Sequence, residues 1–229
     1  MPKRRGNALR LFLSALAACA VCGALAYVVY TLWPRWPANV STEAPSLPIT
    51  VAGALFNVPP ASIRVAMQRR PGPQERLDLY FSWPDLTAPK AMTPPDDNAH
   101  NDNARLAMTD RVFVTIRPAE NTLSPIDRLR NVFPRHLEDA TFSDPSGLVG
   151  RKFKDGGPYQ GEDLLSDLAT SERFFVRCTR AGTIQARCVL DRRIENTEVS
   201  IRFPREWLGE WREAFANMER LLVLIRPPG

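Results

Sequence analysis

The stretch from Leu11 to Trp33 constrains this chain most, because its 23 residues include no charged side chain. A helix rises about 1.5 Å per residue, so the stretch would be about 35 Å long and could cross a hydrocarbon core of about 30 Å. Residues 11–33 are therefore predicted to form a transmembrane helix that contacts the lipid bilayer along its length.

Charge on either side of this stretch predicts its orientation. The tail 1–10 carries four basic residues and no acidic one, whereas residues 34–48 contain one basic and one acidic residue. Positive charge stays on the cytoplasmic side of a membrane, so the N-terminus is predicted to be cytoplasmic and the rest exported. In a bacterium this gives a single-pass protein of the inner membrane with a periplasmic C-terminal domain.

Two other fates of the N-terminus stay open. Leu16-Ala17-Ala18-Cys19 resembles the site at which bacterial lipoproteins are lipidated, and Ala24-Leu25-Ala26 resembles a signal peptidase site after Ala26. The apolar run continues beyond both sites to Leu32, which favours an uncleaved signal anchor.

The charge balance argues against a nucleic-acid partner. The formal net charge is +5, but the tail supplies four of the 30 basic residues, which leaves 26 basic against 25 acidic residues in the remainder. The exported part therefore has almost no surplus with which to neutralise phosphates.

The four cysteines fall into two kinds. Cys19 and Cys22 lie within the apolar stretch, where they are interpreted as small residues of a helix face. Cys178 and Cys188 occupy matching places in two strand-like runs around a turn near Gly182. If these runs pair in antiparallel fashion, the two cysteines face each other within reach of a disulfide, which an exported domain would retain.

After a Pro-rich linker at 34–48, residues 49–226 are predicted to form one domain of the α+β class. Alternation of apolar residues indicates strands at 49–52, 76–83, 110–117, 173–180, 183–190 and 197–203. Helices are expected at 124–133, where a capping serine precedes a proline, and at 162–169 and 205–225. The last helix carries an apolar stripe that is expected to pack against an antiparallel sheet: Trp207, Trp211, Phe215, Met218, Leu222 and Ile225.

Two long segments without periodicity are the candidate binding loops. Residues 85–109 include an acidic cluster with His100, but they lack the glycine and the closing glutamate of a calcium loop, so no metal site is assigned. Residues 147–161 are rich in glycine without matching a nucleotide-binding loop. Five residues there form the possible interaction loop: Arg151, Lys152, Phe153, Lys154 and Tyr159.

Catalytic signals are weak. His100 and His136 are the only histidines, and no hydrolase or metalloprotease motif surrounds either of them. No catalytic residue or cofactor is therefore assigned, and the protein is expected not to be an enzyme.

Several segments resemble one group of known sequences. The runs VAGALFNVPPASIR and LDLYFSWPDL, the late pair of Arg-Cys dipeptides and the terminal W-x-x-x-W resemble uncharacterised single-span, membrane-anchored periplasmic proteins of Gram-negative bacteria, especially alphaproteobacteria. This resemblance implies a periplasmic location and assigns no catalytic residue.

These observations lead to one main hypothesis and two alternatives. The main hypothesis is an accessory or scaffold protein that presents an interaction surface to an envelope protein partner. The alternatives are a cell-wall or glycan-processing enzyme that uses loop carboxylates, and a module that binds a small ligand or a cation.

Overall fold

The computed structural model describes residues 4–32, 45–89, 110–183 and 185–226. Helix α1 (Arg4–Leu32) covers nearly all of the uncharged stretch. Among the helices of these described residues, none satisfies both the length and the apolarity that a membrane crossing requires. The chain divides into two compact units, Met1–Ala38 and Asn39–Gly229, and the second contains every strand that the structure describes.

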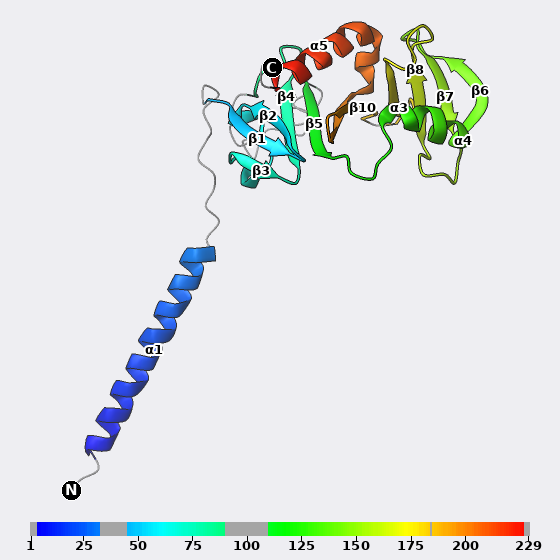
Figure 1. Ribbon diagram of the computed structural model, residues 1–229. Coiled ribbons are helices and arrows are strands. Elements are labelled where there is room, and N and C mark those ends of the chain that lie inside the picture. The colour runs from blue at the N-terminus through cyan, green and yellow to red at the C-terminus, as the bar shows by residue number, and fades with distance from the viewer. Residues whose placement is uncertain (1–3, 33–44, 90–109, 184, 227–229) are drawn as a thin grey trace. The chain divides into compact units, whose positions relative to one another are not determined.

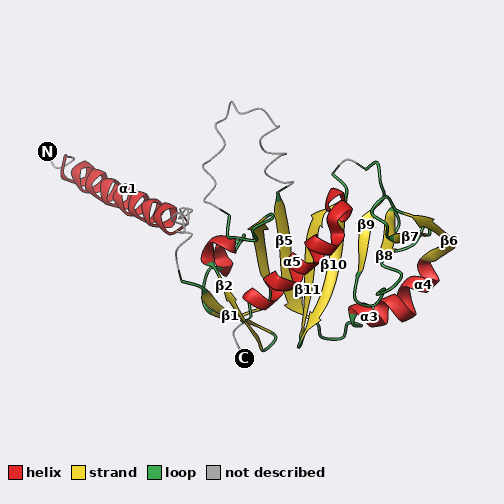
Figure 2. Cartoon of the chain, turned by 90° about the horizontal axis from the view of Figure 1, so that it is seen from above, coloured by secondary structure: helices red, strands yellow, loops and turns green. Residues whose placement is uncertain are grey.

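The second unit is built on an antiparallel sheet of eight strands (Figures 1 and 2). Their order is β4 (Leu77–Ser82), β5 (Arg111–Pro118), β11 (Thr197–Pro204), β10 (Arg187–Ile194), β9 (Phe175–Thr179), β8 (Glu162–Ser166), β7 (Val149–Phe153) and β6 (Leu137–Ser143). The α+β class and the antiparallel sheet are thus confirmed.

Helix α5 (Trp211–Leu224) covers one face of this sheet, where it crosses β5, β11 and β10 in Figure 2. A small sheet completes the cover, with β1 (Leu47–Val51) between β2 (Ala54–Val58) and β3 (Gly72–Gln74). Apolar residues from both sheets and from α5 form the main core. The amide of Asn57 donates to the carbonyl of Ile225 at 2.7 Å and fixes the end of the helix.

The C-terminal helix confirms the predicted packing, although it begins later than expected. Residues Arg205–Glu210 form the 3₁₀ helix η4 instead, and Trp207 there stacks on Trp83 with ring centroids 4.3 Å apart. Within α5, Trp211, Met218 and Leu222 are buried in the main core, so the apolar stripe packs in the interior of the domain.

A second, smaller core lies on the opposite face of the sheet. A helical segment covers it, made of α3 (Pro125–Asp127), the π-helical turn η3 (Arg128–Val132) and α4 (Phe133–His136). Successive residues of β9 alternate between the two faces, since Phe175 belongs to the second core and Val176 to the main core. The second core consists of Phe133, Leu137, Phe153, Leu164 and Phe175.

The helix expected at 124–133 is therefore present but longer than predicted. Ser124 caps it, and its side chain accepts a hydrogen bond from the amide of Asp127. Pro134 does not end the helix, because it occupies the first turn of α4, after a π turn in which the Phe133 amide bonds to the Arg128 carbonyl. Proline has no backbone N–H group, but the N–H groups of the first helical turn have no partner within the helix, so proline fits there.

Two other expectations are wrong. The helix expected at 162–169 is strand β8, which lies between β7 and β9 and buries Leu164 and Leu165 on opposite faces of the sheet. Burial on both sides outweighs helix propensity there. The glycine-rich segment 147–161 contains β7 rather than only loop. Strand β1 begins at Leu47, two residues before the expected start of the domain at 49.

Candidate interaction surface

The described residues cover only part of the face of the eight-stranded sheet opposite α5, and the part that they leave open lies over β4, β5, β11, β10 and β9. We call this part the open face. Register places one polar row across four strands: Asp78 pairs with Thr115, Thr115 with Ser200, and Ser200 with Asp191. Because all four residues point away from α5, the open face carries a band of hydrogen-bonding groups rather than an apolar surface.

Hydrogen bonds within this row fix its carboxylates. The Thr115 hydroxyl donates to Asp78 Oδ1 at 3.1 Å, and the Ser200 hydroxyl donates to Asp191 Oδ1 at 2.6 Å. Arg76 adds two further donors to Asp78 Oδ1, at 2.8 and 3.1 Å. Both carboxylates therefore stay buried but satisfied.

Arg128 reaches over the row from the π-helical turn. It donates to Glu198 Oε2 at 2.8 Å and to Asp191 Oδ2 at 3.2 Å. Arg177 on β9 bonds to Glu162 at 2.7 Å and lies 3.7 Å from Asp191. Two guanidinium groups thus connect carboxylates from three strands.

Burial and hydrogen bonding act in opposite directions on the carboxyl of Glu198, whose side chain is 1% exposed. Burial alone would raise its pKa, but hydrogen bonds and charge from Arg117 and Arg128 outweigh this effect and lower the pKa below 4.5. The pKa of Asp78 is also lowered, because donors from Arg76, Gln68 and Thr115 outweigh its burial. Both groups are carboxylates at neutral pH.

A groove of about 390 Å³ runs along the open face. Its floor is polar apart from Val189, and Phe133 and Tyr159 form one wall. The arginines at its rim are half exposed, with 54% of the Arg76 side chain and 53% of the Arg117 side chain accessible to solvent. The lining residues are Arg76, Thr115, Arg117, Arg128, Phe133, Tyr159, Glu162, Arg177, Val189, Asp191, Ser200 and Arg202.

The predicted interaction loop contributes little to this groove. Phe153 is buried in the second core, and Arg151 on β7 donates to the carbonyl of Glu138. Lys152 and Lys154 are exposed. Tyr159 alone lines the groove, where it packs against Phe153 with ring centroids 4.8 Å apart. The five residues therefore do not form one surface, because Phe153 lies in the second core and only Tyr159 lies in the wall of the groove.

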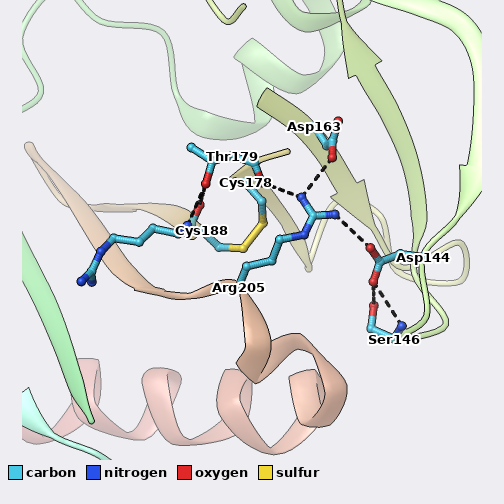
Figure 3. The surroundings of a disulfide bond; sticks show 8 residues. Asp144, Ser146, Asp163, Cys178, Thr179, Cys188 and Arg205 are labelled. Carbon is cyan, nitrogen blue, oxygen red and sulfur yellow. Dashed lines mark hydrogen bonds and ion pairs between the residues drawn. A yellow bond between two sulfur atoms is a disulfide. The ribbon is translucent and has the colours of Figure 1, made fainter. Parts of the chain in front are cut away.

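The predicted disulfide between Cys178 and Cys188 is present, and the two residues pair directly between β9 and β10. Figure 3 shows Arg205 beside it. Arg205 donates to Asp163 at 3.0 Å, to Asp144 at 3.0 Å and to the carbonyl of Thr179 at 2.8 Å. This arginine joins the β6–β7 turn to the disulfide hairpin.

Asp144 belongs to the same network. Burial opposes its ionisation, but Ser146 and Arg205 donate hydrogen bonds to it and lower its pKa below 3.8. Together with the disulfide, these bonds link the β6–β7 turn to β8, β9 and β10.

Other sequence predictions concern sites that the structure does not bring together. Among the described residues, no group of three or more His, Cys, Asp and Glu side chains is placed to hold a metal ion. His100 and most of the segment 85–109 lie outside the described residues. His136 is the last residue of α4, and its ring packs against Tyr159.

Sequence reasoning missed the open face almost completely. The alternation in β4 and β11 predicted that Asp78, Ser200 and Arg202 point away from the core, but it treated that side as solvent. A signal was nevertheless present, because acidic and basic residues fill the outward positions of several consecutive strands. Such a pattern indicates cross-strand ion pairs when the strands become neighbours.

No protein-family model matches this chain, and no curated protein does either. Among solved structures, Smlt3025, an immunity protein of the Stenotrophomonas maltophilia type IV secretion system, is similar with a TM-score of 0.53 and 14% identity, over 80% of this chain and 94% of that one. The chain therefore shares its overall fold with Smlt3025.

A second solved structure gives a lower score. The iron-regulated outer membrane lipoprotein FrpD of Neisseria meningitidis aligns with a TM-score of 0.42 and 8% identity, over 83% of this chain and 95% of that one. At these identities the likeness to Smlt3025 concerns the fold alone, since one fold supports many functions.

Proposed function

We propose that this chain is a membrane-anchored accessory or scaffold protein of the bacterial cell envelope, whose exported domain binds another protein on the open face. The observation that carries this proposal is the groove of about 390 Å³, which a rigid sheet supports and half-exposed arginines border. Arginine and aromatic residues are enriched where proteins bind each other.

The chemistry of the groove favours binding over catalysis. A carboxylic acid that donates a proton near neutral pH needs a raised pKa, whereas the pKa of Glu198 behind the groove is lowered. Arg177 hydrogen-bonds Glu162 and approaches Asp191, so both carboxylates of the lining serve to position arginines. None of the described residues that line the groove is a histidine. The groove therefore supports the scaffold hypothesis over a glycan-processing enzyme.

The location in the envelope rests on two features of the chain. The uncharged stretch 11–33 follows a basic tail, which supports insertion with the N-terminus in the cytoplasm. The disulfide between Cys178 and Cys188 supports an oxidising compartment for the domain. The fold of Smlt3025 adds an analogy to a protein of a secretion system.

Site-specific crosslinking in intact cells tests the proposal. A photoactivatable phenylalanine analogue in place of Val189, on the floor of the groove, should capture one envelope protein that mass spectrometry identifies. The matched control is the same analogue in place of Val223 on α5, which is 70% exposed. Capture of the same proteins from both positions, or of none from Val189, would contradict a docking role for the open face.

A further inference from the structure

Phe113 on β5 is the centre of a second feature of the open face. Register places Tyr80 on one side of it and Arg202 on the other. The guanidinium of Arg64 lies 5.9 Å from the centre of the Phe113 ring, and that of Arg187 lies 5.6 Å from it. Three arginines therefore surround one aromatic ring, and we call Arg64, Arg187 and Arg202 the arginine cluster.

The arginine cluster shares Arg202 with the lining of the groove but differs from the other groove arginines in its charge balance. Arg128 and Arg177 in the groove each contact two carboxylates. Within the described residues, Arg187 and Arg202 form no ion pair. Arg64 lies 3.9 Å from Asp78, a carboxylate that Arg76 already binds at 2.8 Å. The cluster therefore presents positive charge that the described part of the domain leaves largely uncompensated.

Contact with the Phe113 ring orients the guanidinium groups of Arg64 and Arg187 so that they can bind a ligand. A guanidinium group near an aromatic ring gains a cation–π interaction, while its N–H groups stay available in the plane of the fork. That fork matches a carboxylate in two parallel hydrogen bonds. Arg202 is exposed and Arg187 half-buried, so an incoming anion can reach both without unfolding any element.

We propose that the arginine cluster binds the carboxylates of an acidic segment in a partner protein. This inference rests on the proposed function and adds the chemistry that the partner must offer. Phe113 is half-buried beneath two guanidinium groups rather than protruding, so it cannot insert into a bilayer as the apolar residues of a membrane-binding surface do. The near balance of charge beyond the tail also disfavours nucleic acid.

Peptide binding to the full chain in non-ionic detergent micelles tests this proposal. The probe is a fluorescein-labelled octapeptide of alternating glutamate and tyrosine, and the control peptide has glutamine in place of each glutamate. The double variant Arg187→Gln/Arg202→Gln should weaken binding of the acidic peptide at least about tenfold, because two charge-assisted contacts are lost. Anisotropy titrations at low and high salt measure the affinity and its screening.

The matched control is Arg212→Gln/Arg220→Gln, which removes the same charge from exposed positions on α5. Its affinity should stay within about twofold of the wild type, because salt-screened charges on the other face contribute little. Equal losses in both double variants would overturn the proposal. So would binding of inorganic phosphate or phosphatidylglycerol vesicles that depends on Arg187 and Arg202 when peptide binding does not.

The two proposals can fail separately. If Val189 still captures its protein in the Arg187→Gln/Arg202→Gln background and peptide binding is unchanged, the acidic-segment inference is wrong and the docking function stands. If peptide binding requires the cluster but Val189 captures nothing, the cluster binds carboxylates and the proposed function is wrong.

Discussion

Replacement of Arg128 by methionine tests whether the ion pairs behind the groove hold the domain together. Only 17% of the Arg128 side chain is exposed, and its guanidinium binds Glu198 at 2.8 Å and Asp191 at 3.2 Å. Methionine keeps much of the aliphatic packing but leaves both carboxylates with one donor fewer.

The structure sets the magnitude of the effect. Removal of one partner from a buried pair costs about 3–5 kcal/mol when the other charge is left alone. Here Glu198 keeps Arg117, and Asp191 keeps Ser200 and the more distant Arg177, so we expect the lower end of that range. A loss of about 3 kcal/mol would lower the melting temperature by roughly 6–12 °C for a domain of this size.

Arg130 provides the matched control, because it lies in the same π-helical turn and pairs with Glu172 through side chains that are 57% and 52% exposed. Arg130→Met should cost much less than Arg128→Met, because exposed ion pairs contribute little to stability. Urea unfolding of the full chain in detergent, followed by tryptophan fluorescence, measures both free energies of unfolding. Equal losses in the two variants would refute the claim that burial makes the Arg128 pairs important.

Three further predictions concern stability. Replacement of both Cys178 and Cys188 by serine should lower the free energy of unfolding by about 3 kcal/mol, since the bond closes a short loop. Gly150→Ala should cost about 1–3 kcal/mol in a thermal melt, because the new methyl group would collide with the ring of Phe142 on β6. Because its folded pKa is lowered, Glu198 stabilises the domain above its ordinary pKa of 4.5, and this contribution should disappear as the pH falls through the lowered value in urea titrations.

Each of these predictions has a control. Reducing agent should destabilise the wild type and leave the Cys178→Ser/Cys188→Ser variant unchanged. Gly209→Ala should cost much less than Gly150→Ala, since no atom lies within 4 Å of the added methyl group. Glu198→Gln should flatten the acid dependence of stability below pH 4.5, and an unchanged slope would contradict the role given to that carboxylate.

Local patterns in the sequence predicted much of the covered side of the sheet. The alternation of Leu77, Leu79 and Phe81 identified β4, and the matching positions of Cys178 and Cys188 predicted both the disulfide and the β9–β10 register. These features are local, because a period of two residues reports which side of a strand is buried, and a short hairpin brings its own strands together.

The tertiary structure decided the candidate surface. Arg128 and Glu198 are 70 residues apart in the chain, and their contact exists only because β11 pairs with β5 and the π-helical turn lies over β10. Periodicity says that a residue faces outward but not which distant strand lies beside it, and strand order follows from packing of the whole core. The sequence by itself therefore determined the elements and the thiol pair, whereas the groove and the arginine cluster depend on long-range strand pairing.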